Sequence, residues 1–557
     1  MADDQRSILV VGASAAGLRC ACRLARLKPA WTVRVVEARS VFSYAACGLP
    51  YALSGDIGDP ESLRRTDYGV TRDSDYFDRY KGIEVLAGYQ ATKLDVERRV
   101  LTVKNPHGSR ENLTWDELVL ATGASPIRLK AQGNHPDVVT FHTWEDLEPL
   151  KRRLAVGGLE RVALVGAGLV GCELAEAFRS LWGAEVVLVE AESAPLPRLL
   201  DPDLADCVAQ HLRDNGVTVL QNARVKSIRS DGGKIELVAG DHHVEAQAAV
   251  VAVGVEPETK LARQAGLERG PGGAIVVDRR LATSVPHVWA VGDCATVRHA
   301  VTGEIDYVPL GSLANRQGRT LANILAGSAD EFPPVTGAAA VKVFDWNVAS
   351  SGCTERSARH NGLAARSAWI SALDRPHYWP EAEEIHLKLV YDEESGRVHG
   401  VQAAGKGEVA KRIDVATQLI ARGATLDDFI HVEHAYAPPY SPALEPLAVA
   451  AMVAQNQRDG IESVSPDESW DGVSILDVRS SEDAAQHPAA AEQVLQIPLE
   501  ELNERSCELD DTEHVVVCAR GTRSAEATRV LARRGLRARY LGGGLSWRKK
   551  MDEKDEP

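Results

Sequence analysis

Residues 7–27 read SILVVGASAAGLRCACRLARL: a short apolar run, a glycine-rich turn and then a helical pattern. The same design returns as RVALVGAGLVGCELAEAF at 161–178 and as HVVVCARGTRSAEATRVLARRG at 514–535. A strand that passes through a tight turn into a helix is the unit of parallel sheets covered by helices on both faces. The sequence therefore predicts an α/β protein with more than one such sheet.

The size and charge of the chain limit what it is expected to do. Its 557 residues exceed what one core accommodates, so several compact units are expected. A formal net charge of −16 argues against nucleic acid or an anionic membrane as partner, because both require a basic face. No apolar run reaches the roughly 18–20 residues that span a bilayer, and the first residues do not resemble a signal peptide. Nine scattered cysteines fit a reducing cytoplasm, and a small molecule is the expected partner.

The glycine spacing in the second copy is typical of a dinucleotide site. Gly166, Gly168 and Gly171 form a GxGxxG turn between strand and helix. The first glycine permits the turn, the second admits a pyrophosphate and the third lets helix and strand pack closely. Glu190 follows about 20 residues later, at the end of the next strand, where a carboxylate binds a ribose hydroxyl.

The first copy is a variant of the same turn. Gly12 and Gly17 flank Ser14, which replaces the middle glycine, and Glu37 supplies the acid. One such turn alone often marks only tight strand–helix packing. Two turns in the same context, each followed by an acid, favour two nucleotide sites.

Together with LVLATGASP at 118–126 and VWAVGDCA at 288–295, these turns make the chain resemble the pyridine nucleotide-disulfide oxidoreductases. The resemblance implies FAD at the first turn and NAD(P)H at the second. It places FAD on Gly12, Ser14, Ala15, Gly17, Glu37, Thr122, Gly123, Gly292 and Asp293, and the nicotinamide nucleotide on Gly166, Gly168, Gly171 and Glu190. Glu190 would repel a 2′-phosphate, so NADH is expected over NADPH, although Arg198 nearby leaves NADPH open.

Cys47 is the candidate redox residue of this region. It follows the strand that ends at Glu37 and precedes a helical stretch. At a helix N-terminus a thiol is expected to have a lowered pKa, and the thiolate is the form that attacks a sulfur–sulfur bond. No second cysteine lies near it in sequence. A single thiol must form a mixed disulfide or a persulfide with its substrate.

The segment SYAACGLPY, residues 43–51, resembles the single-cysteine subgroup of coenzyme A-disulfide reductases and persulfide reductases. The resemblance implies a homodimer in which two tyrosines of the partner approach the redox sulfur, a role that falls on Tyr378 and Tyr436. It also implies substrate contacts at Ser43 and Asn315. Ordinary packing at a dimer interface is the alternative for the tyrosines.

Coenzyme A, a further possible ligand, would be held by basic residues along the first helix, which Arg19, Arg23 and Arg26 match. A solvated helix face explains the same arginines. One expected lysine is replaced by Leu444, so one phosphate contact is missing. Ala15 stands where the related NADH peroxidases and oxidases carry a histidine, which weakens that function as an alternative.

The last part of the chain resembles a rhodanese domain through SILDVRS at 474–480, CARGTRSAEA at 518–527 and YLGGGLSW at 540–547. Cys518 ends an apolar strand and opens a loop whose N–H groups, with Arg520 and Arg523, are expected to hold a persulfide. A phosphatase loop and an inactive domain are the alternatives. The altered stretch QHPAAAEQ at 486–493 predicts different substrate access.

The remaining cysteines show no metal spacing and are expected to be buried small side chains: Cys20, Cys22, Cys172, Cys207, Cys294, Cys353 and Cys507. No metal site is predicted. The expected units are two Rossmann-like dinucleotide-binding domains, an α+β dimerisation domain and an α/β rhodanese domain. Their limits are 1–150 with 255–331 for FAD, 151–254 for NAD(P)H, 332–454 for dimerisation, 455–465 for a linker and 466–557 for the rhodanese domain.

These features predict an FAD- and NADH-dependent reductase of persulfides, polysulfides or coenzyme A disulfides, with a fused sulfurtransferase. Electrons would pass from NADH through FAD to sulfur held at Cys47, while Cys518 collects or relays sulfane sulfur. An NADH oxidase or peroxidase is one alternative. A flavin-binding redox sensor with a rhodanese-type interaction module is another.

Overall fold

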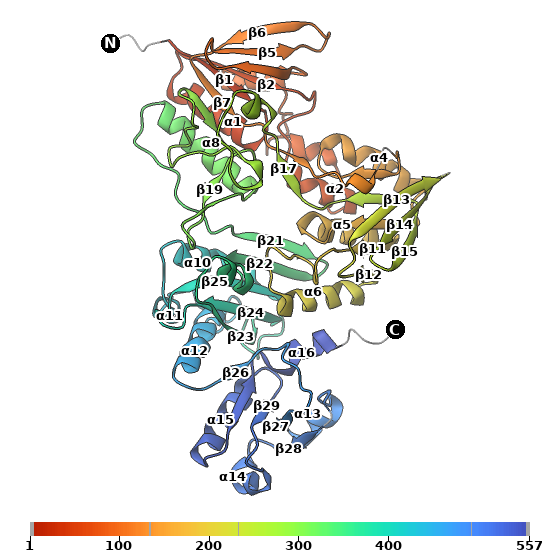
Figure 1. Ribbon diagram of the computed structural model, residues 1–557, viewed down its shortest axis with the longest axis vertical. Coiled ribbons are helices and arrows are strands. Elements are labelled where there is room, and N and C mark those ends of the chain that lie inside the picture. Colours follow the sequence, from red (N-terminus) through yellow and green to blue (C-terminus); the bar gives the residue numbers. More distant parts are fainter. Residues whose placement is uncertain (1–4, 133–134, 232, 492, 553–557) are drawn as a thin grey trace.

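A computed structural model describes residues 5–132, 135–231, 233–491 and 493–552. The chain forms four units along the long axis of the molecule, with the N-terminal unit at one end and the C-terminal unit at the other (Figure 1). Within the described residues, no helix is long and apolar enough to cross a membrane.

The first unit is built on a parallel sheet of strand order β18-β7-β1-β2-β3. Its strands are β1 (Ser7–Val11), β2 (Thr32–Glu37), β3 (Glu84–Ala87), β7 (Glu117–Leu120) and β18 (Val288–Ala290). Alternate residues of β1 enter two different cores: Ile8 and Val10 pack with α1 (Ala15–Leu27) and α8 (Gly311–Leu325). Leu9 and Val11 pack with the antiparallel sheet β4 (Gln90–Asp95), β5 (Val100–Lys104) and β6 (Arg110–Thr114). The sheet therefore lies between helices and a second sheet.

The second unit repeats this plan with strand order β12-β11-β10-β16-β9. The strands are β9 (Val138–Thr140), β10 (Arg161–Val165), β11 (Glu185–Val189), β12 (Val217–Leu220) and β16 (Ala248–Val251). The helices α4 (Trp144–Ala155), α5 (Leu169–Ser180) and α6 (Pro202–Asp214) pack against it, with the antiparallel sheet β13 (Val225–Asp231), β14 (Lys234–Ala239) and β15 (His242–Ala246).

The chain crosses between these two units on a pair of antiparallel strands, β8 (Ala124–Pro126) and β17 (Val255–Pro257). The return crossing coincides with the expected limit at residue 255. The outward crossing comes earlier than the expected limit at residue 150, because β9 already pairs with β16 of the second sheet. That strand is three residues long, too short to be recognised from its sequence.

The third unit is an antiparallel sheet of order β21-β22-β25-β24-β23. It comprises β21 (Ala339–Val343), β22 (Trp346–Gly352), β23 (Arg366–Leu373), β24 (Glu384–Tyr391) and β25 (Val398–Gly405). The helices α9 (Glu355–His360), α10 (Ala410–Ile420), α11 (Leu426–Ile430) and α12 (Pro446–Arg458) complete its core.

The fourth unit is a parallel sheet of order β26-β30-β29-β27-β28. Its strands are β26 (Ser463–Val464), β27 (Ser474–Asp477), β28 (Val494–Gln496), β29 (His514–Val517) and β30 (Ala538–Leu541), and its helices are α13 (Ser481–Gln486), α14 (Leu502–Arg505), α15 (Thr522–Arg533) and α16 (Gly544–Asp552). The linker is shorter than the expected 455–465, because α12 runs to Arg458 and β26 already pairs with β30.

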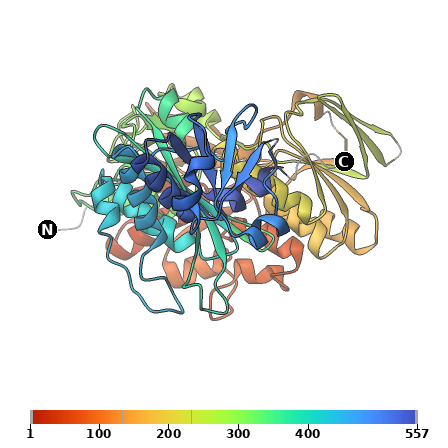
Figure 2. The ribbon, with the colours of Figure 1, turned by 90° about the horizontal axis from the view of Figure 1, so that it is seen from below.

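The fourth unit is fixed to the others by a tryptophan. Trp547 on α16 is fully buried in the core that α6 and the third sheet share, and its Nε1 donates to the Asp203 carbonyl at 3.1 Å. Beside it, the Lys388 ammonium lies 2.8 Å from the Asp203 carboxylate and 3.1 Å from that of Asp201. Seen from below, the blue C-terminal unit overlies the sheet of the third unit (Figure 2). This junction holds the C-terminal unit against the second and third units.

Candidate active sites

The two glycine turns have the same geometry. Gly12 and Gly166 both have positive φ, +113° and +99°, and a Cβ on either would collide with a backbone carbonyl oxygen at 2.1 and 2.6 Å. Only glycine fits such a position. The N–H of the following residue donates to the strand-end acid in each copy, Ala13 to Glu37 at 2.8 Å and Ala167 to Glu190 at 2.7 Å. The spacing predicted from sequence thus brings turn and acid together twice.

Both turns leave room for a pyrophosphate at a helix N-terminus. Gly168 caps α5, and no atom lies within 4 Å of a Cβ placed on it. Ser14 caps α1 without a side-chain capping hydrogen bond. Gly17 and Gly171 approach the carbonyl oxygens of their own turns so closely that a Cβ would lie about 2 Å away. Backbone N–H groups with a carboxylate for the ribose are the donor set that FAD and NADH require.

The other residues expected at the first nucleotide also border its sheet. Asp293 follows β18, and burial raises its pKa to about 6. Gly292 donates to the Gln317 side chain of α8 at 2.7 Å. The Thr122 hydroxyl donates to the Glu258 carbonyl at 2.5 Å, beside Gly123. These residues lie at the carboxyl ends of β7 and β18, where ligands of open α/β sheets bind.

Cys47 lies in a 3₁₀ turn, Ala46–Gly48, directly before α2 (Leu49–Ser54). Its side chain is exposed, and a Cβ placed on Gly311, the first residue of α8, would lie 4.0 Å from its sulfur. Ser43, which has a positive φ of 57°, donates from its backbone to the Ala13 carbonyl at 3.2 Å. That contact ties the cysteine segment to the first glycine turn. Asn315, on the next turn of α8, donates to the Gly311 carbonyl at 2.9 Å.

The electrostatics of Cys47 differ from the expectation of a lowered pKa. Surrounding protein atoms partly desolvate the thiol and raise its pKa, and the carboxylates of Glu173 and Asp293 raise it further. The expectation considered only the N-terminus of the following helix, whereas desolvation has the largest effect on this pKa and two acids from other parts of the chain add to it. Within the protein chain alone, the thiol form is favoured.

Glu173 and Tyr51 are residues of this site that the sequence did not reveal. The Tyr51 hydroxyl donates to Glu173 at 3.1 Å, joining α2 of the first unit to α5 of the second. Burial raises the pKa of Glu173 to about 7. Glu173 lies two residues after Gly171, and this position beside the glycine turn was the feature of the sequence that could have indicated it.

The three arginines of α1 lie beside a second group of polar residues. Arg19 and Arg26 are exposed, and Arg23 donates to the Asn323 side chain of α8 at 3.0 Å. Arg19, Arg26 and Lys81 all lie close enough to Cys22 to act on its thiol, whose pKa burial raises. Exposed Tyr68 contacts Tyr76 on the same face, with their hydroxyls 3.4 Å apart. This basic and aromatic face, formed by α1 and α3 (Ser74–Lys81), is called the basic face below.

Tyr378 and Tyr436 come together on the surface of the third unit, although 58 positions separate them in sequence. Both side chains are exposed, and desolvation together with a hydrogen bond between the two phenols raises the pKa of Tyr378. Tyr440 and Leu444 are exposed on the same segment as Tyr436. The structure therefore brings the two predicted tyrosines together but does not place either beside Cys47 of its own chain.

Cys518 follows β29 and lies in a cradle of N–H groups. Gly521 and Ser524 donate from their backbone to its sulfur at 3.2 and 3.4 Å, and the Ser524 hydroxyl lies 3.4 Å away. Gly521 has a φ of +94° and caps α15, so the loop turns its N–H groups inward as expected. Ser524, fully buried, was missed from the sequence because its spacing from the cysteine carries no separate signal.

Both arginines of this loop form ion pairs with acids. Arg523 lies 3.4 Å from Asp483 of α13, and Arg520 lies 3.7 Å from Glu384, the first residue of β24. Neither partner was predicted, because both are distant in sequence. On the side of Arg520, the loop thus faces the third unit.

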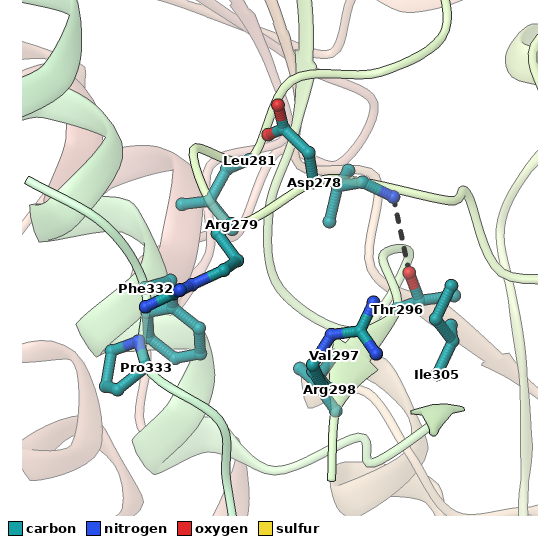
Figure 3. Close-up of a pocket in the computed structure, with 10 residues that line it drawn as sticks. Asp278, Arg279, Leu281, Thr296, Val297, Arg298, Ile305, Phe332 and Pro333 are labelled. Atoms are coloured by element: carbon teal, nitrogen blue, oxygen red, sulfur yellow. Dashed lines mark hydrogen bonds between the residues drawn. The ribbon is translucent and has the colours of Figure 1, made fainter. Parts of the chain in front are cut away.

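A hollow of about 40 Å³ lies beside β19 (Val297–Arg298) (Figure 3). Neither Cys47 nor Cys518 lines it. Arg279 and Phe332 line it on one side and Arg298 on another, and the Val277 N–H donates to the Thr296 hydroxyl at 3.3 Å. Its volume holds about one water, so it is no nucleotide site.

Of the remaining cysteines, Cys20, Cys172, Cys207, Cys294 and Cys353 are buried as expected, Cys22 is half-buried, and Cys507 is exposed, contrary to expectation. Cys507 lies in a 3₁₀ turn at the surface of the fourth unit. Among the residues described, no three His, Cys, Asp or Glu side chains gather as metal ligands.

Comparison with known proteins gives three family matches. Residues 6–316 match the pyridine nucleotide-disulphide oxidoreductases, residues 338–448 the dimerisation domain of that family, and residues 463–550 the rhodanese-like domain. Together these matches agree with the expected order of units.

Three individual proteins are similar over most of the chain. A persulfide reductase from A. fulgidus, named NAD-dependent, is 40% identical, with a TM-score of 0.93 over 97% of this chain and 99% of that one. The reduced CoADR-RHD of Bacillus anthracis is 29% identical, with a TM-score of 0.92 over 99% of both chains. A Pyrococcus furiosus protein named NAD(P)H sulfur oxidoreductase (CoA-dependent) is 33% identical over 81% of this chain and 99% of its own length.

Proposed function

This chain belongs to the pyridine nucleotide-disulphide oxidoreductase family, and we propose that it uses FAD and NADH to reduce persulfides, polysulfides or coenzyme A disulfides. The observation that carries the proposal is the exposed thiol of Cys47, whose segment is tied to the first glycine turn and whose sulfur lies near the first residue of α8. The fused C-terminal unit carries sulfane sulfur on Cys518.

Bound FAD, once reduced by NADH, would supply the electron pair that splits the sulfur–sulfur bond. The net change for a persulfide is RSSH plus two electrons and two protons, giving RSH and H₂S. In this chain Cys47 would hold the sulfur as a mixed disulfide, since no neighbouring cysteine competes for it. Glu190, the strand-end acid that accepts a hydrogen bond from the second turn, favours NADH, because its carboxylate would repel a 2′-phosphate.

The basic face supports coenzyme A as the carrier. Arg19, Arg26 and Lys81 offer positive charge to its phosphates, and the exposed Tyr68 ring offers a surface for adenine. The relative from Pyrococcus furiosus is named as dependent on the same carrier. Because Leu444 supplies no charge, the arginines and Lys81 would carry the phosphate contacts alone.

A homodimer would complete the site. Tyr378 and Tyr436 are exposed on the unit that matches the family's dimerisation domain, and a phenol there could donate a proton to a departing sulfur. We assign residues 1–150 and 255–331 to FAD binding and 151–254 to the nicotinamide nucleotide, except that β9 and α4 belong to the second unit because β9 pairs with β16.

The test is Cys47→Ser in the holoenzyme. We expect NADH-driven H₂S release from coenzyme A persulfide to fall about a thousandfold or more, with the flavin absorbance retained, whereas Cys507→Ser keeps full activity as the exposed-thiol control. Retained H₂S release in Cys47→Ser would contradict the role. An oxygen-electrode trace with NADH alone separates the reductase from an NADH oxidase.

A further inference from the structure

A second hollow, of about 420 Å³, lies where the second, third and fourth units meet. The residues that matter here are Asp214 at the end of α6, Asp345, Glu383, Glu384 and Lys406 of the third unit, and Ser546 of α16. This volume is within the range of pockets that bind small molecules. We call it the junction pocket.

The junction pocket adjoins the Cys518 loop on two sides. The Ser546 N–H donates to the Ala519 carbonyl at 2.9 Å, directly after Cys518. Glu384 forms the ion pair with Arg520, two residues after Cys518. Two pocket walls therefore contact the loop within two residues of its sulfur. Cys518 itself is buried, but the outer sulfur of a persulfide stands about 2 Å beyond it.

The charges of the junction pocket favour a cation. Four carboxylates line it, those of Asp214, Asp345, Glu383 and Glu384, against the single ammonium of Lys406. That ammonium lies 2.8 Å from Asp345, and Arg520 outside the lining lies 3.7 Å from Glu384. His211 and His386 also line the pocket, yet its carboxylates outnumber the cationic side chains of Lys406 and Arg520. A carrier rich in phosphate would be repelled.

We propose that the junction pocket binds the small thiol that exchanges sulfane sulfur with Cys518, and that it selects thiols bearing an ammonium group. The proposal rests on the proposed sulfur-carrying function of Cys518. In the step concerned, the thiol sulfur attacks the outer sulfur of the Cys518 persulfide. A new bond forms to the thiol sulfur, the bond to Cys518 breaks, and its electron pair stays on the Cys518 sulfur, which takes the proton. The sulfane sulfur moves without net oxidation or reduction.

The experiment measures sulfur transfer from thiosulfate by the full-length holoenzyme without NADH. The acceptors are cysteamine, 3-mercaptopropionate and 2-mercaptoethanol, which share a two-carbon thiol and differ in an ammonium, a carboxylate or a hydroxyl group. The quantity compared is the ratio of kcat/KM for cysteamine to that for 3-mercaptopropionate. Dividing each variant's ratio by that of the wild type cancels the intrinsic reactivity of the thiols.

Glu383→Lys should lower this ratio at least tenfold, while Lys406→Glu should raise it. The matched control is Glu381→Lys, an exposed neighbour outside the pocket lining, whose ratio should stay within about twofold of the wild type. Turnover of 2-mercaptoethanol checks that each variant is folded.

An unchanged ratio in both Glu383→Lys and Lys406→Glu, with transfer to 2-mercaptoethanol intact, would overturn the pocket assignment. If Glu383→Lys loses all turnover, Lys406→Glu alone decides. Failure of the underlying function gives a different result: the wild type would transfer to no thiol, or Cys518→Ser would transfer as fast as the wild type.

Discussion

Cys47 and Cys518 are both single thiols next to a helix N-terminus, yet their surroundings are opposite. Cys47 is exposed, and the carboxylates of Glu173 and Asp293 raise its pKa beyond the effect of burial. Cys518 is buried and accepts two backbone hydrogen bonds on its sulfur. The proposed roles fit this difference: a thiol that reacts with a large substrate would need to be open, whereas one that stores an anionic sulfur would be stabilised by enclosing N–H donors.

The approaches to the two thiols also differ in charge. The basic face lies in the first unit that carries Cys47, and the acidic junction pocket adjoins Cys518. If each surface selects its carrier, the chain handles an anionic carrier at one thiol and an ammonium-bearing thiol at the other. Sulfur arriving on one kind of carrier could then leave on another.

The largest expected effect comes from detaching the fourth unit. Trp547→Ala should cost about 3–5 kcal/mol, because it empties a fully buried site and removes a hydrogen bond to Asp203. We expect calorimetry to show a separate, earlier transition for the fourth unit, and the preference for ammonium thiols to disappear. NADH-driven reduction at Cys47 should persist.

The matched control for Trp547→Ala is Trp470→Ala, which removes a buried tryptophan from the core of the fourth unit itself. It should lower stability without removing the thiol preference of the folded protein. If Trp547→Ala leaves both the transition and the preference unchanged, the junction is not what positions the Cys518 loop.

A smaller effect is expected from Arg19→Glu on the basic face. The charge changes by two units beside the proposed phosphate site, so kcat/KM for NADH-driven reduction of coenzyme A persulfide should fall about tenfold or more at low salt. Glutathione persulfide, which has no phosphates, should be reduced as before. Arg110→Glu, an exposed arginine of β6, serves as control. An equal loss for both substrates would show that Arg19 does not select the carrier.

The contacts that follow from spacing along the sequence are local ones. Gly12 with Glu37, and Gly166 with Glu190, are linked by one strand–turn–helix–strand unit, so their spacing determines their contact. The Cys518 loop is local in the same way. Family resemblance also brought together Tyr378 and Tyr436, which no short-range pattern joins.

The features that sequence missed depend on contacts between units. Glu173 acts on Cys47 only because α5 of the second unit packs against α2 of the first, and its carboxylate adds to the desolvation that raises the pKa of Cys47. Arg520 meets Glu384 only because the fourth unit docks on the others, through Trp547 and through the Gly543 N–H that donates to the Trp369 carbonyl. Such contacts follow from how folded units pack, which a spacing along the chain does not encode.

The smallest expected effect tests the contribution of Glu173 directly. Glu173→Gln removes a carboxylate that raises the pKa of Cys47, so the pKa of the thiol should fall, by less than about one unit, and more thiolate should be present at a given pH. Because the pKa of Glu173 is itself raised to about 7, the wild-type acid is charged only above that pH. Alkylation of Cys47 by iodoacetamide should therefore be faster in the variant above pH 7 and converge with the wild type below it. Exposed Cys507, followed by mass spectrometry in the same sample, should react equally in both proteins. Identical Cys47 rates at pH 8 would mean that Glu173 does not act on the thiol, and that only burial and Asp293 distinguish its electrostatics from those of Cys518.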